Sequence, residues 1–213
     1  KRFARSIFQA IIPREKYVPE QVNLSIFIKF YMKKFFLVFI TLSFIIVCNA
    51  QTSTETIIKE ACKEAGTQNK KAFIIFHASW CVWCHKLDSC INDPSCKKFF
   101  SDNYVIKHVT AFETGDKKNL NNPGSSEFLA AHHAADQGIP AWFIFDSSKN
   151  LLADSQLRPH SNDFNVEGSN IGCPANETEI KYFISVLEKT SHITDEEKSA
   201  IMKRFSKNHL TSE

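Results

Sequence analysis

The first 50 residues contain none of the chain's six glycines and none of its eight histidines, so the composition changes at about residue 50. Their longest apolar run, residues 35–47, is shorter than the roughly 20 residues that a membrane-spanning helix needs. Basic residues precede this run and small residues follow it, which is the order of a secretory signal peptide. We therefore expect a signal peptide at residues 32–50, cleavage near Ala50 and no stable membrane span.

Residues 1–31 precede the expected signal peptide, and secretion does not require a segment at this position. The chain begins with Lys1, and Met32 is followed directly by two lysines. We expect residues 1–31 to be an upstream extension translated from a wrongly placed start; an unusually long basic N-terminal region is the alternative. The expected mature protein is residues 51–213, located in the bacterial periplasm or secreted.

The expected mature segment has no basic patch interleaved with aromatic residues, so nucleic acid is not an expected partner. The first 50 residues hold eight Lys or Arg and two acidic residues, so residues 51–213 have a formal net charge of −3, although the full chain has +3. Repeats and low-complexity tracts are also absent from the sequence. The length of residues 51–213 suits one domain with a substantial core.

Hydrophobic periodicity in residues 51–213 predicts an α/β domain with a central mixed sheet flanked by helices. Strands are expected at residues 72–76, 104–109, 141–146 and 151–153, and helices after the capping residues Thr52, Ser125, Asn176 and Thr194. A further helix is expected after residue 81, interrupted at Asp93-Pro94 and resumed at residues 95–100. Residues 115–125 are expected to form a polar surface loop, whereas residues 160–174 give little signal.

Residues 80–85, with the sequence Trp-Cys-Val-Trp-Cys-His, follow the first expected strand and begin the next expected helix. Free N–H groups and the helix dipole favour a thiolate at a helix N-terminus. Such placement lowers the pKa of a thiol from about 8.5 toward about 7 or below. The motif therefore predicts dithiol/disulfide chemistry, with Cys81 as the nucleophile and Cys84 as the resolving thiol.

The spacing of these residues also fits two other kinds of site. Cys-x-x-Cys-His is the attachment signature of c-type haem, in which His85 would be the iron ligand. The thiols could instead form half of a zinc site completed by His85, Cys90 or Cys96. The motif alone leaves all three interpretations open.

From about Thr54 to Lys189 the chain resembles the thioredoxin family, most of all the exported thioredoxin-like proteins of bacteria. The resemblance rests on the apolar strand, the Trp-Cys-x-x-Cys motif, its helix, and Gly138-Ile139-Pro140 ahead of a strand pair. It implies a thioredoxin-like fold and an enzyme that exchanges disulfides with protein substrates and with a redox partner protein, without a cofactor. A redox-inert binding module on the same fold is the alternative.

The resemblance also implies roles for residues around the motif. Pro140 is expected to be a cis-proline that faces the two cysteines, and the Ile139 backbone to bind a substrate chain. Trp80 is expected to form an apolar wall beside Cys81, or else to be a plain core tryptophan.

Two departures from the family pattern bear on the chemistry. Ile75 stands where thioredoxins usually have a buried acidic proton acceptor, so His77 and His85 become the nearby groups for proton transfer. Val82-Trp83 replaces the Gly-Pro of thioredoxin between the cysteines. Because this pair gives no signal of a strong oxidant, we expect the reductase or exchange direction.

Four further cysteines belong to the mature segment. Cys90 and Cys96 flank a turn and are expected to form a structural disulfide. Cys62 and Cys173 are expected either to pair or to remain as two separate thiols. Residues 132–133, His-His, are expected to be surface histidines that bind no metal, since adjacent helical side chains point in different directions.

Overall fold

The computed structural model describes residues 28–29, 31–35 and 51–209, in two compact units that divide the chain between Asn49 and Ala50. In the first unit, the described residues are helical and exposed. Most of the expected signal peptide, its cleavage site and most of the expected extension lie outside the described residues. Every helix among the described residues is too short or too polar to cross a bilayer.

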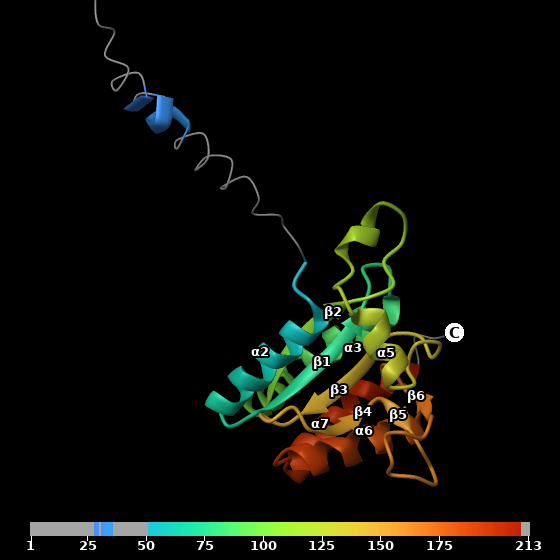
Figure 1. The fold of residues 1–213 in the computed structure, drawn as a ribbon. Coiled ribbons are helices and arrows are strands. Elements are labelled where there is room, and N and C mark those ends of the chain that lie inside the picture. Colours follow the sequence, from blue (N-terminus) through green and yellow to red (C-terminus); the bar gives the residue numbers. More distant parts are fainter. Residues whose placement is uncertain (1–27, 30, 36–50, 210–213) are drawn as a thin grey trace, which may run out of the picture. The chain divides into compact units, whose positions relative to one another are not determined.

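Four strands form the sheet at the centre of the second unit (Figure 1). Their order is β2-β1-β3-β4, where β1 is parallel to β2 and antiparallel to β3, and β4 is antiparallel to β3. The strands are β1 Lys71–His77, β2 Tyr104–Thr110, β3 Ala141–Phe145 and β4 Leu151–Asp154. The central strands β1 and β3 are the most continuously apolar and are buried on both faces of the sheet. The expected mixed sheet is confirmed.

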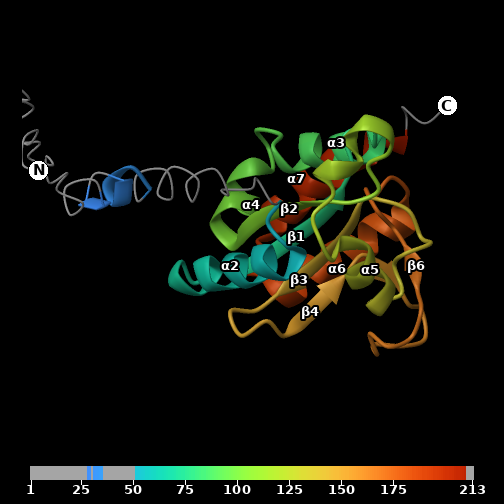
Figure 2. The same cartoon turned by 45° about the horizontal axis from the view of Figure 1, so that its top comes forward.

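Helices cover both faces of this sheet (Figures 1 and 2). Because side chains alternate along a strand, Phe73 and Ile75 point to one face and Ile74 and Phe76 to the other. Four helices pack on the first face: α3 Val82–Ile91, α4 Lys97–Asn103, α6 Glu177–Thr190 and α7 Asp195–Ser206. Two helices pack on the second face: α2 Thr54–Thr67 and α5 Ser125–Ala131. The core is therefore two apolar layers, one on each side of the sheet.

Polar side chains cap the N-termini of α2, α6 and α7, and the cap of α2 differs from the expected one. Helices α6 and α7 start with capping boxes at Asn176 and Thr194, as predicted. Helix α2 starts one residue later than predicted, because the side chain of Ser53, and not that of Thr52, accepts the backbone hydrogen bond of the first turn.

The break between α3 and α4 lies at the predicted position and is held by Asp93. Its carboxylate accepts hydrogen bonds from the N–H and the hydroxyl of Ser95 and from Nε of Arg204 in α7. The two Ser95 bonds are the largest causes that lower the pKa of Asp93 to about 2. The break therefore also ties the end of α3 to α7.

Three details were not predicted. A second sheet of two antiparallel strands pairs β6 Ser169–Asn170, in the weak-signal stretch, with β5 Gln156–Leu157, which precedes that stretch. The expected surface loop contains a 3₁₀ helix, η1 Gly115–Leu120. The N-cap of α5 is Gly124, with φ +82°, and not Ser125, because the chain enters this helix through a left-handed turn.

Candidate active site

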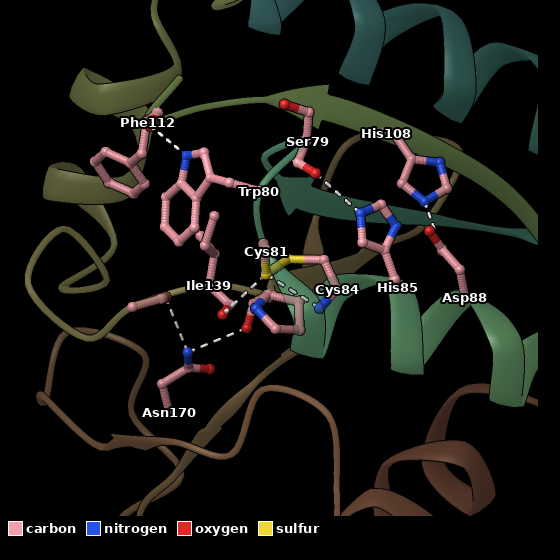
Figure 3. Close-up of a disulfide and its surroundings, with 12 residues drawn as sticks. Ser79, Trp80, Cys81, Cys84, His85, Asp88, His108, Phe112, Ile139 and Asn170 are labelled. Carbon is pink, nitrogen blue, oxygen red and sulfur yellow. Dashed lines mark hydrogen bonds and ion pairs between the residues drawn. A yellow bond between two sulfur atoms is a disulfide. The ribbon is translucent and has the colours of Figure 1, made fainter. Parts of the chain in front are cut away.

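Cys81 and Cys84 form a disulfide at the N-terminus of α3 (Figure 3). Their sulfur atoms are 2.07 Å apart and their α-carbons 5.3 Å apart. Cys81 is the N-cap residue, and its Sγ accepts a 3.1 Å hydrogen bond from the N–H of Cys84. Because a helix N-terminus favours negative charge, a thiolate in the reduced protein is stabilised at Cys81 more than at Cys84, which lies inside the first turn.

A cis peptide bond joins Ile139 and Pro140, as the family resemblance implies. Figure 3 shows Ile139 beside the disulfide, with its carbonyl oxygen 3.5 Å from Sγ of Cys81. This distance allows the thiol of a reduced Cys81 to donate to the carbonyl. The structure thus brings together Cys81, Cys84, Ile139 and Pro140, although the proline is far from the motif in sequence.

Asn170 on β6 holds the loop that contains the cis-proline, and the sequence analysis missed it. Its Nδ2 donates to the carbonyl oxygens of Gln137, Gly138 and Pro140 at 3.2, 3.1 and 3.1 Å. Its backbone N–H donates to Oε1 of Gln137 at 3.0 Å. These bonds satisfy the backbone of a tight loop next to the disulfide. No local pattern marks Asn170, because its position depends on the pairing of two very short strands.

An exposed apolar rim borders the disulfide. Trp80 is 56% exposed, and Val82 is also exposed. The indole N–H of Trp80 donates to the carbonyl oxygen of Phe112 at 3.0 Å (Figure 3). The alternative that Trp80 is a core residue is therefore wrong. Trp83 is half-buried, and the ammonium group of Lys86 lies 4.1 Å from the centre of its ring.

Glu113 fixes the turn that precedes the disulfide, and the sequence analysis missed it as well. Its buried carboxylate accepts hydrogen bonds from the N–H and the hydroxyl of Ser79, at 2.5 and 3.1 Å. Lys117 of η1 donates to the same hydroxyl at 2.9 Å. The backbone bond from Ser79 is the largest cause that lowers the pKa of Glu113, so this carboxylate stays ionised. Glu113, the acidic residue near the motif, thus holds the backbone at Ser79 in place.

Histidines line the other side of the motif (Figure 3). Nε2 of His85 lies 3.0 Å from the carbonyl oxygen of Ser79, and Nε2 of His108 lies 2.8 Å from Oδ1 of Asp88. His77 is half-buried at the end of β1, with its ring centre 4.9 Å from that of His108. Both histidines predicted for proton transfer therefore flank the segment that leads into the disulfide.

The ionisation of His77 predicts how stability depends on pH. Burial is the largest cause that lowers its pKa, followed by the neighbouring His108. The unfolded chain therefore binds more protons at this site than the folded chain below about pH 6.5. We expect the free energy of unfolding to fall as the pH decreases from about 7 to about 5, and to fall less in His77→Gln. Urea unfolding of both proteins across this range measures the effect, and parallel pH profiles would contradict it.

The interior next to the motif is apolar where thioredoxins have an acid. Ile75 is buried and pairs in register with Trp142 of β3. Among the described residues, no group of three or more His, Cys, Asp or Glu is placed to hold a metal ion. In residues 132–133, the ring of His132 stacks on Phe128, with ring centres 4.1 Å apart, and His133 is exposed.

The remaining cysteines of the mature segment do not follow the expected pairings. Four cysteines are free thiols: Cys62, Cys90, Cys96 and Cys173. The expected Cys90–Cys96 disulfide is not formed: both thiols are free, and the Cys90 thiol is instead engaged with Oδ1 of Asn208 at 3.5 Å. Cys62 and Cys173 follow the second expected alternative and are separate thiols, because they pack on opposite faces of the sheet.

A mixed sheet in this order, a Cys-x-x-Cys disulfide at a helix N-terminus and a cis-proline beside it define a thioredoxin fold with a dithiol centre. The family model described as "Thioredoxin-like" matches residues 54–147. Residues 54–147 are therefore thioredoxin-like in sequence as well as in fold. A comparison with curated proteins found no match.

Three of the solved structures that resemble the chain are bacterial proteins. A disulphide isomerase from Xylella fastidiosa Temecula1 has 20% sequence identity and a TM-score of 0.38, and the match covers 51% of this chain and 75% of that one. The DsbD C-terminal domain of Neisseria meningitidis in the oxidised form has 16% identity and a TM-score of 0.39, with 66% of this chain and 99% of that one covered. The exposed lipoprotein thioredoxin of Streptococcus pneumoniae strain TIGR4 has 16% identity and a TM-score of 0.33, with 54% of this chain and 90% of that one covered.

Proposed function

We propose that the protein is an exported thiol-disulfide oxidoreductase that exchanges disulfides with protein substrates. Its main support is the disulfide of Cys81 and Cys84 at the start of α3, with the Ile139 carbonyl oxygen 3.5 Å from Sγ of Cys81. This arrangement places a redox-active sulfur, a stabilising helix terminus and the Ile139 backbone within one small area.

In the reductase direction, the thiolate of Cys81 attacks one sulfur of a substrate disulfide. The substrate S–S bond breaks, a mixed disulfide with Cys81 forms, and one substrate thiolate leaves and takes up a proton. The thiolate of Cys84 then attacks the sulfur of Cys81, which releases the second substrate thiol and leaves the Cys81–Cys84 disulfide. Two electrons pass to the substrate, and a partner protein with a dithiol reduces the centre again.

The surface around the centre suits an extended polypeptide. The Ile139 backbone can pair with a substrate chain as a short strand would, and Trp80 offers an apolar surface beside it. The hydrogen bond from the Trp80 indole to Phe112 fixes the ring in this position. We therefore assign substrate binding to Trp80, Ile139 and Pro140.

Proton transfer at Cys84 needs a group other than the usual acid, because Ile75 cannot accept a proton. We assign it to His77 or His85. The lowered pKa of His77, caused mainly by burial, keeps the ring neutral at neutral pH and able to accept a proton. When the proton of neutral His85 is on Nε2, this N–H donates to the carbonyl oxygen of Ser79. Nδ1 is then the basic nitrogen of the ring.

A haem-binding function fits this geometry poorly. Thioether bonds to haem would consume both sulfur atoms, and both would have to be reachable by the porphyrin. Cys84 is instead buried beneath the first turn of α3, and Nε2 of His85 is engaged with Ser79.

Export is supported by residues 32–50, which have the order of a signal peptide. An oxidising compartment outside the cytoplasm is also where protein disulfides persist as substrates. N-terminal sequencing of the secreted product tests this part of the proposal. An N-terminus near Gln51 is expected, and a product that retains residues 1–31 would overturn it.

Insulin reduction in the presence of dithiothreitol tests the enzymatic proposal. The full chain is expected to accelerate the precipitation of reduced insulin well beyond the rate with dithiothreitol alone. A rate equal to that of dithiothreitol alone would overturn the proposal.

The redox potential of the Cys81–Cys84 pair tests the direction. Family members range from about −270 mV for reductants to about −120 mV for strong oxidants. With Val82-Trp83 between the cysteines, we expect a value toward the reducing end of this range. Equilibration with reduced and oxidised glutathione, followed by alkylation and mass spectrometry, measures it. A potential near −120 mV would contradict the reductase direction while leaving the exchange chemistry intact.

A further inference from the structure

Two buried thiols outside the motif meet at one amide side chain. Cys90, in the last turn of α3, is 0% exposed, and Cys173, just before α6, is 5% exposed. Nδ2 of Asn208, a buried residue after α7, lies 3.4 Å from Sγ of Cys90 and 3.3 Å from Sγ of Cys173. The same Nδ2 donates to the carbonyl oxygen of Pro174 at 2.9 Å, which fixes its position. Three distant parts of the chain therefore bring the two sulfur atoms to one nitrogen.

The two thiols also shift each other's pKa. Interaction with Cys173 is the largest cause that lowers the pKa of Cys90, and interaction with Cys90 is the largest cause that raises the pKa of Cys173. The other two free thiols lack such a partner arrangement: Cys96 lies next to the Ser95 hydroxyl at 3.6 Å, and Cys62 packs on the opposite face of the sheet. Among the four free cysteines of the described residues, Cys90 and Cys173 are thus the two whose sulfur atoms lie beside the same side chain.

We infer that Cys90 and Cys173 form a second, structural disulfide when the protein folds in an oxidising compartment. The oxidant is a low-molecular-weight disulfide such as glutathione disulfide. The Cys90 thiolate attacks it and releases one small thiol, and the Cys173 thiolate then attacks the Cys90 sulfur and releases the second. The two protons of the cysteines end on the two released thiols. Since both sulfurs are buried in the folded protein, the bond forms before Asn208 and α7 cover them.

This disulfide would join the motif helix to the segment that supports the cis-proline loop. Cys173 follows Gly172, where an added β-carbon would lie 3.3 Å from the carbonyl oxygen of Pro140. The carbonyl oxygen of Gly172 accepts from the indole N–H of Trp142 at 2.8 Å. Asn170, three residues before Cys173, binds three carbonyl groups of the loop. A covalent bond at this place fixes the spacing between the two halves of the site, and it does not depend on the direction or the substrate of the proposed enzyme.

Peptide mapping of the full chain, refolded with reduced and oxidised glutathione, tests the pairing. After denaturation without reductant, alkylation and proteolysis, we expect linked peptides for Cys81–Cys84 and Cys90–Cys173, with Cys62 and Cys96 alkylated. Full alkylation of Cys90 and Cys173, or a Cys90–Cys96 linkage, would overturn the inference.

Thermal unfolding gives a second test in the full chain with Cys81 and Cys84 changed to serine, which removes the motif disulfide. In this background, protein refolded with dithiothreitol is expected to have a Tm lower by roughly 5–10 °C than protein refolded with glutathione disulfide. The difference is expected to vanish when Cys173→Ser is added and to persist with the matched control Cys62→Ser. Equal Tm values in the parent background would overturn the inference.

Discussion

Replacing Cys81 with serine is expected to remove the insulin-reducing activity, with a loss on the order of 10³-fold that leaves only the background rate of dithiothreitol. A serine hydroxyl ionises far above neutral pH and cannot form a disulfide with the substrate, so the first step of exchange is lost. The environment of Cys81 explains why this residue is decisive: it caps α3, it accepts from the Cys84 N–H, and it lies next to the Ile139 carbonyl.

The matching change Cys84→Ser separates the two steps of the reaction. Attack by Cys81 remains possible, but the mixed disulfide cannot be resolved within the protein. We expect this variant to accumulate a covalent complex with a disulfide-containing substrate, visible on a non-reducing gel, and Cys81→Ser to form none.

Cys96→Ser and Cys62→Ser are the controls for both experiments, because these buried thiols lie outside the site. Each is expected to retain nearly the full rate of insulin reduction. Wild-type activity in Cys81→Ser would show that the motif does not perform the exchange, and equal losses in the controls would show an effect on folding.

The sequence predicted the elements whose pattern is local. The continuous apolar run of β1 indicated a central strand, and the capping boxes at Asn176 and Thr194 placed the starts of α6 and α7 correctly. Cys81 and Cys84 were recognisable as a candidate dithiol pair from their two-residue spacing at a predicted helix N-terminus, and the family resemblance favoured this interpretation over haem or zinc. The relation of Pro140 to this motif came from the family resemblance, since nothing in the local sequence distinguishes a cis from a trans proline.

The unpredicted features depend on contacts between distant segments. Asn170 acts through a two-residue strand, which is too short to show any periodicity. Glu113 binds Ser79 only because β1 and β2 end side by side. The neighbour of Cys90 could not be found because cysteine connectivity is not encoded in spacing, and the turn at Asp93-Pro94 favoured a wrong local pairing.

A buried ion pair supports the second sheet, and with it the residues behind the active site. Asp154 ends β4 and Arg158 follows β5; their side chains are 1% and 5% exposed. Two parallel hydrogen bonds of 2.8 Å join the guanidinium to the carboxylate, which also accepts from the N–H of Gln156. Nε of Arg158 donates to the Val166 carbonyl, so the pair closes the loop that leads to β6.

Replacing Asp154 with alanine is expected to lower the free energy of unfolding by about 3–5 kcal/mol, because it leaves the Arg158 charge buried without its partner. Changing both residues, as in Asp154→Leu with Arg158→Met, removes the uncompensated charge and is expected to recover much of this loss. Chemical denaturation of the three proteins measures both effects.

The exposed pair of Lys98 and Asp102 on α4 is the matched control for this prediction, since its side chains are 85% and 53% exposed. Water already solvates both charges there, so Asp102→Ala is expected to change the free energy of unfolding by less than about 1 kcal/mol. If Asp154→Ala were no more destabilising than Asp102→Ala, the buried pair would not be holding the β5–β6 segment.

Because the β5–β6 segment contains Asn170, a loss of its order is expected to release the cis-proline loop and to weaken substrate binding at Ile139 before the whole domain unfolds.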